Sequence, residues 1–175
     1  TRATAADLAR IAAEIAADWP AQAALLTAPG GTNTTYLTET EARQALFTQL
    51  VTGLASLSDG RLGRPLGTFQ KPRPERAEAV ASGRSLRNIR LSLEGLRDLA
   101  LALHPDAPLT QAAFDRALAL AQDLEDPVLA GVATPQGRLK VEILQQAVQS
   151  AQAAVETEIG AALGVSTGFN AKDGD

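Results

Sequence analysis

The sequence lacks cysteine altogether and contains few aromatic residues. Its 175 residues include one Trp, one Tyr and four Phe. The absence of cysteine excludes disulfide bonds, thiolate zinc sites and cysteine nucleophiles. The shortage of aromatic residues argues against a β-sandwich, because strands favour aromatic and β-branched side chains, whereas the abundant alanine and leucine favour helices. The sequence also has no run of 18 or more apolar residues, the length at which a segment becomes a candidate membrane-spanning helix.

The sequence also lacks the short motifs of common catalytic and ligand sites: HExxH, GxSxG, the P-loop and the EF-hand loop. Its one histidine, His104, precedes Pro105 at the end of a predicted helix, and we interpret it as a residue that interacts with the helix dipole. The alternative for His104 is a zinc or haem ligand. Glu156 and Glu158 lie two residues apart and point to different sides of a helix, which argues against a di-metal carboxylate site. We therefore predict no catalytic residue, metal ligand or cofactor in this chain.

Hydrophobic periodicity predicts an all-α fold, an antiparallel helical bundle. Apolar residues recur at three- and four-residue intervals along most of the chain. Thr38 with Glu41, Ser85 and Thr134 are predicted N-terminal capping residues, and Gly164 a C-terminal one. The predicted helices span residues 5–26, 38–57, 74–81, 85–103, 108–125 and 134–163. We expect Ser58-Asp59-Gly60 to end the second helix, so that one long connection rich in Arg, Pro and Gly covers about residues 58–85.

A basic segment, residues 61–90, dominates the charge distribution. It contains eight of the sixteen Lys and Arg residues and two acidic residues, so its net charge is +6, whereas the whole chain has a net charge of −4. Arginine suits the planar, bidentate recognition of carboxylates and phosphates. The negative overall charge, and the presence of only one aromatic residue (Phe69) in the segment, argue against a nucleic-acid-binding surface.

Two interpretations of the basic segment stay open. In the first, arginine side chains converge with the backbone N–H groups at the start of a helix to bind an anionic ligand. The candidate ligand-binding residues are Arg64, Arg73, Arg84, Ser85, Arg87 and Asn88. In the second, the segment is a structural clasp, in which Glu75 and Glu78 form ion pairs with Arg84 or Arg87 and hold the long connection over the bundle.

Several runs of residues resemble the C-terminal half of the imelysin family, also called peptidase M75. They are RLGRPLG at 61–67, PRPE at 72–75, SGRSL at 82–86, LEGL at 93–96 and LGVSTGFN at 163–170, followed by DGD at 173–175. The resemblance implies an all-helical protein of two modules. Residues 1–175 would then be a single helical domain, the C-terminal module of a longer protein, with the N-terminal half as its partner. Because Thr1 opens almost directly into a helical pattern, we interpret the chain as a fragment or processed piece.

The resemblance also implies a location and a function. Imelysin-like proteins are exported to the periplasm or cell envelope by a signal peptide in the precursor, are often lipoproteins, and are tied to iron or haem uptake. The family's Gly-x-His-x-x-Glu metal motif belongs to its N-terminal half, and this chain contains no His-x-x-Glu. We therefore expect a binding component in iron or haem acquisition rather than an enzyme. The alternatives are part of a metal-dependent peptidase whose ligands lie in the missing half, and a scaffold module without a small ligand.

Overall fold

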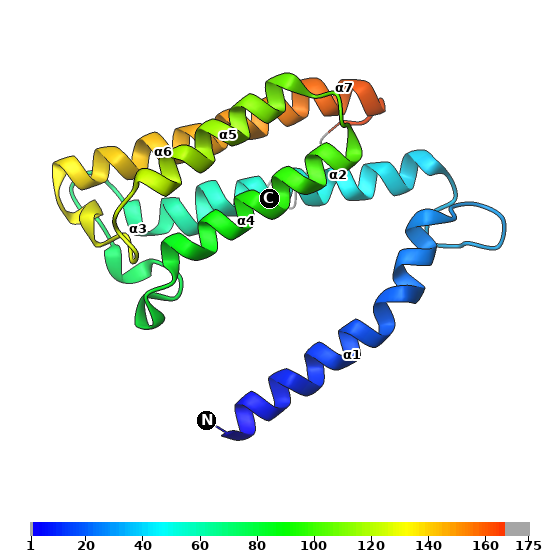
Figure 1. Ribbon diagram of the computed structural model, residues 1–175, viewed down its shortest axis with the longest axis horizontal. Coiled ribbons are helices and arrows are strands. Elements are labelled where there is room, and N and C mark those ends of the chain that lie inside the picture. The colour runs from blue at the N-terminus through cyan, green and yellow to red at the C-terminus, as the bar shows by residue number, and fades with distance from the viewer. Residues whose placement is uncertain (1, 167–175) are drawn as a thin grey trace. The chain divides into compact units, whose positions relative to one another are not determined.

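A computed structural model of the protein describes residues 2–166 and confirms the all-α prediction (Figure 1). Within these residues the structure contains no β-strand, and the one extended pairing is an isolated bridge between Thr68 and Lys71. The chain forms two compact units, the first ending at Ala45 and the second beginning at Leu46. Part of the C-terminal motif noted above, from Thr167 onward, lies outside the described residues.

The first unit consists of a long helix, a turn-rich loop and the start of the second helix. Helix α1 (Arg2–Thr27) continues through Pro20, and α2 spans Glu39–Ala55. The predicted cap at Thr38 is confirmed, because its hydroxyl accepts a hydrogen bond from the N–H of Glu41 at 3.2 Å. The Glu41 carboxylate in turn accepts one from the N–H of Leu37 at 2.6 Å. These reciprocal bonds satisfy N–H groups that a helix start leaves unpaired.

The second unit is a bundle built on helices α2, α4, α5 and α6. Their bounds beyond α2 are α4 Ser85–Leu103, α5 Pro108–Asp123 and α6 Pro135–Ala154. Helix α5 packs against both α4 and α6, and Figure 1 shows these neighbours running antiparallel. The apolar faces that the periodicity predicted meet in one core, whose largest fully buried side chains include Phe47, Leu54, Ile89, Phe114 and Leu144. Burial of such side chains stabilises the bundle by about 1.5–3 kcal/mol each.

The second helix does not stop at Ser58-Asp59-Gly60, so that predicted end is wrong. The chain continues as a π-helical segment, η1 (Ser56–Gly63), and as one α-helical turn, α3 (Arg64–Leu66). The amide of Gln145 on α6 donates a hydrogen bond of 2.9 Å to the carbonyl of Ser58. This contact gives the Ser58 carbonyl a hydrogen-bond partner within η1, where the ordinary α-helical pattern of backbone hydrogen bonds is interrupted.

The predicted helix over residues 74–81 is also wrong. The structure has two short 3₁₀ turns instead, η2 (Pro74–Arg76) and η3 (Val80–Ser82), separated by Ala79 in the left-handed conformation with φ 59°. A non-glycine residue with positive φ interrupts a right-handed helix. The predicted cap at Ser85 is wrong as well, because Ser85 is the first residue of α4 and its buried hydroxyl donates to the carbonyl of Glu78 at 2.5 Å.

The last helical run begins and ends where the sequence predicts. The Thr134 hydroxyl accepts from the N–H of Gly137 at 3.2 Å, and Pro135 is the first residue of α6. The run passes through a second π-helical segment, η5 (Val155–Ile159), into α7 (Gly160–Leu163). Gly164 then adopts φ 65°, a left-handed conformation that confirms it as the C-terminal cap.

Candidate functional site

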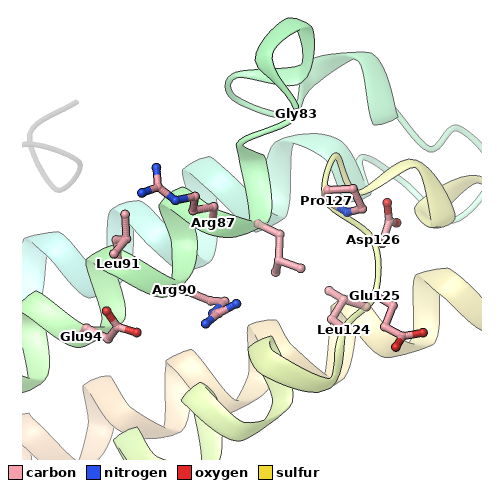
Figure 2. Close-up of a pocket in the computed structure, with 10 residues that line it drawn as sticks. Gly83, Arg87, Arg90, Leu91, Glu94, Leu124, Glu125, Asp126 and Pro127 are labelled. Carbon is pink, nitrogen blue, oxygen red and sulfur yellow. The ribbon is translucent and has the colours of Figure 1, made fainter.

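A pocket of about 380 Å³ lies beside the N-terminal half of α4 (Figure 2). One side is formed by the turn before α4 and by α4 itself, and the other by the segment that follows α5. The residues that line it are Gly83, Leu86, Arg87, Arg90, Leu91, Glu94, Leu124, Glu125, Asp126 and Pro127. Its volume lies within the range of small-molecule sites, about 300–1,000 Å³.

The packing of α4 places two arginines at this pocket. Leu86 and Ile89 are buried in the core, so Arg87 and Arg90, three residues apart, fall on the exposed side of the helix. Figure 2 shows Arg90 extending toward Leu124 and the segment after it, whereas the Arg87 guanidinium points away from that segment. Among residues 2–166, neither arginine forms an ion pair or a side-chain hydrogen bond. Both guanidinium groups therefore keep their donors for solvent or a ligand.

The wall opposite α4 is held by hydrogen bonds. The Asp126 carboxylate accepts from the N–H groups of Ala130 and Gly131 at 3.0 and 2.7 Å. The Pro127 carbonyl accepts from the N–H of Leu86 at 3.1 Å, which ties this wall to the first turn of α4. The pocket therefore has a fixed backbone frame, and its arginine side chains extend from that frame.

Two carboxylates share the pocket with the arginines. Glu94 lies one turn along α4 from Arg90 and is half-buried, and Glu125 is exposed on the opposite wall. Neither forms an ion pair or hydrogen bond with another residue of the described chain. The lining thus carries unpaired charges of both signs.

The predicted ligand-binding residues do not all reach this pocket. Arg87 lines it, and Arg84 is exposed directly before α4. Ser85 is buried, and Asn88 contributes its backbone carbonyl, which accepts from Arg61 at 3.1 Å. Two others lie elsewhere: Arg64 is exposed on α3, and Arg73 lies 3.4 Å from the carboxylate of Glu75.

The predicted clasp acids are paired with arginines other than Arg84 and Arg87. The carboxylate of Glu78 lies 2.6 Å from Arg61, and that of Glu75 pairs with Arg73. Arg61 also donates to the hydroxyl of Ser92 at 2.6 Å and so connects η1, the long connection and α4. The sequence indicated Arg61 only through its position in the basic segment.

Arg138 on α6 is a second arginine that holds the connection, and the sequence did not single it out. Its guanidinium donates to the carbonyls of Leu66 and Thr68 at 2.6 and 3.1 Å and to the carboxylate of Glu142 at 2.7 Å. It also lies 5.8 Å from the ring centroid of Phe69, a cation–π distance. Its side chain is 11% exposed, so it acts as a fixed support for this connection.

Glu158, like Asp126, is a carboxylate that accepts two backbone hydrogen bonds. It accepts from the N–H groups of Thr110 and Leu109 at 2.7 and 3.2 Å, at the start of α5. Desolvation raises the pKa of Glu158, but these hydrogen bonds and the charge of nearby His104 lower the pKa by more, and the net shift is downward. Over residues 2–166, no group of three or more His, Asp or Glu side chains is placed to hold a metal ion.

Comparison with known families identifies the class of protein that this all-helical chain represents. A model of the Imelysin family, Peptidase_M75, matches residues 1–155. The chain therefore belongs to the imelysin family. No curated protein and no solved structure matches it. No helix of the described chain combines the length and hydropathy of a membrane span.

Proposed function

We propose that this chain is the ligand-binding, C-terminal module of an imelysin-like protein of the bacterial cell envelope. In this proposal the protein binds carboxylate-bearing iron ligands, such as haem through its propionates or a ferric carboxylate complex, during iron acquisition. Membership of the imelysin family supports the envelope location and the link to iron. The expected partner is the N-terminal half of the same protein. The protein is expected to lie in the periplasm, attached to the membrane by a lipid anchor.

The observation that carries the proposal is the pair formed by Arg87 and Arg90. Both residues are exposed and line a pocket that also has apolar surface, and no carboxylate of the described chain pairs with either of them. Guanidinium groups bind carboxylates through charge-assisted, often bidentate hydrogen bonds. The pocket is large enough for the carboxylate end of such a ligand, with the rest of the ligand outside.

Calorimetric titration of haem and of ferric citrate tests the proposal. We expect at least one of them to bind, and the double variant Arg87→Gln, Arg90→Gln to weaken binding about tenfold or more. Arg116→Gln is the matched control, because Arg116 is an exposed arginine on α5 that does not line the pocket. The absence of binding, or equal affinity in the double variant and the control, contradicts the proposal. Binding that requires the longer protein places the site in its other half.

A second candidate function, an interaction module, is favoured by an apolar stripe on α1. Leu8, Ile11, Ile15 and Trp19 are between 39% and 64% exposed. Exposed apolar stripes of this kind mark protein-binding surfaces. Addition of the N-terminal half of the protein should then shift the fluorescence of Trp19, the only tryptophan in the chain. An unchanged spectrum at saturating concentration would remove this candidate.

A further inference from the structure

The charge pattern of the α4 pocket also suits a class of ligand other than iron-bearing carboxylates. Arg87 and Arg90 can satisfy a carboxylate, but Glu94 and Glu125 line the same pocket and need a cationic partner. We infer that the pocket binds a small zwitterion, a molecule with one carboxylate and one ammonium group, of the amino-acid or dipeptide class. This inference rests on the carboxylate recognition proposed above and adds the second charge.

The four charged side chains do not pair with one another. In the described chain no ion pair joins Arg87 or Arg90 to Glu94 or Glu125. A ligand with both charges would complete two ion pairs at once, which an anion or a cation alone would not.

Asp126 is excluded from this role although it lines the pocket. Both of its carboxylate oxygens already accept backbone hydrogen bonds, from Ala130 and Gly131. These bonds fix the turn that follows Glu125, on the side of the pocket opposite α4. The cationic end of the ligand is therefore assigned to Glu94 and Glu125.

The rest of the lining sets the size and polarity of the ligand. Leu86, Leu91, Leu124 and Pro127 form apolar surface between the charged groups. A pocket of about 380 Å³ accommodates a molecule of dipeptide size. An apolar side chain between the two charged ends fits this lining best, because it removes apolar surface of both partners from water.

Three probes of nearly equal size separate the contributions of the two charges. They are leucyl-leucine, N-acetyl-leucyl-leucine, which lacks the ammonium group, and leucyl-leucinamide, which lacks the carboxylate. Amide NMR titrations of the intact chain yield a dissociation constant for each. We expect leucyl-leucine to bind about tenfold more tightly than either blocked probe, since each loses one charge-assisted contact.

Two double variants assign each end of the ligand to one pair of side chains, the arginines or the glutamates. Arg87→Gln with Arg90→Gln should remove the preference for the free carboxylate but keep that for the ammonium group. Glu94→Gln with Glu125→Gln should do the reverse, and Arg116→Gln should keep both preferences. These residues are exposed or half-buried, so their loss should not unfold the bundle.

Two results would overturn the inference. If the acetylated probe binds as tightly as leucyl-leucine, Glu94 and Glu125 do not contribute, and carboxylate recognition alone survives. If none of the three probes produces saturable shifts, the pocket does not bind zwitterions of this class. The haem and ferric citrate titration then decides the proposed iron function separately, because those ligands carry no ammonium group.

Discussion

At the scale of single residues, Arg138 contributes most visibly to the order of the long connection. Its guanidinium binds two backbone carbonyls and one carboxylate and is almost fully enclosed. We expect Arg138→Ala to lower the free energy of unfolding by about 2–3 kcal/mol, because the carbonyls of Leu66 and Thr68 lose a charged donor. Urea unfolding followed by circular dichroism measures this change.

Lys140→Ala is the matched control for Arg138→Ala. Lys140 is a basic residue on the same helix, two positions away, and is exposed. Its replacement should change the free energy of unfolding by less than about 0.5 kcal/mol. An equal effect of both substitutions would mean that Arg138 acts through helix charge rather than through its contacts with the connection.

The lowered pKa of Glu158 predicts that the folded protein loses stability in acid. Because hydrogen bonds to its carboxylate lower the pKa of Glu158 in the folded state, the charged form stabilises the fold at pH values above the unfolded pKa of about 4.3. This contribution disappears as the pH falls through the lower, folded pKa. Thermal melts at pH 7 and pH 3 should therefore show a smaller drop in midpoint for Glu158→Gln than for the unchanged protein.

Glu156→Gln is the control for the acid effect. Its carboxylate accepts a single side-chain hydrogen bond, from Gln152 at 3.0 Å, at an exposed site of the same π-helical segment. This substitution should leave the difference between the two melting midpoints close to that of the unchanged protein. An identical acid response in both variants would show that the contact of Glu158 with α5 does not carry the effect.

Single residues also show where sequence reasoning about the site reaches its limit. The basic segment pointed to Arg87, which lines the pocket, because clustered arginine is visible in sequence. The prediction included Arg73, which pairs with Glu75, and left out Arg90, which lines the pocket. Arg138 lay outside the segment, and its partners include backbone carbonyls, which every residue possesses. Contacts of this kind have no sequence signature.

At the scale of elements, the long helices were predictable and the irregular turns were not. The starts of α5 and α6 and the cap at Gly164 follow from proline, threonine and glycine at fixed local positions. The π-helical segment η1 is joined to α6 by a hydrogen bond between Ser58 and Gln145, 87 residues apart in the sequence. Local propensity favoured a stop at Gly60, and this tertiary contact accompanies a continued helix instead.

The junction between the turn η4 (Ala130–Ala133) and α6 depends on two glycines in close approach. A methyl group at Gly137 would overlap the backbone of Gly131, which cannot move aside as a flexible side chain can. We expect Gly137→Ala to destabilise the protein by about 2–3 kcal/mol, the cost of overpacking against a rigid neighbour. Chemical denaturation of the purified variant measures this cost.

Gly95→Ala on α4 should stabilise the protein, whereas Gly137→Ala should destabilise it. Apart from its chain neighbours and the backbone of its own helix, no atom lies within 4 Å of the position that a Cβ would take at Gly95, in the interior of α4. Alanine there should stabilise the protein by about 0.5–1 kcal/mol through its higher helix propensity. If both glycine substitutions destabilise the protein equally, the close approach at Gly137 is not the cause.

At the scale of the whole molecule, the apolar core belongs to the second unit. Every residue of the core cluster lies between Phe47 and Val165, and α1 contributes no buried residue. The periodicity of α1 predicted its helix correctly but did not reveal this difference, because an exposed stripe and a core-facing stripe have the same spacing. The distribution of burial therefore predicts that the stability of the bundle is independent of α1.

A variant that lacks residues 1–36 tests this independence. It keeps Leu37, Thr38 and Glu41, and so retains the hydrogen bonds that start α2. Its free energy of unfolding should lie within about 1 kcal/mol of that of the whole chain, because no core residue is removed. Phe47→Ala, at a fully buried position, should by contrast cost about 3–5 kcal/mol. A loss as large as that of Phe47→Ala in the shortened chain would show that α1 stabilises the bundle, and the stripe of Leu8 and Trp19 would then be the first place to look for the contact.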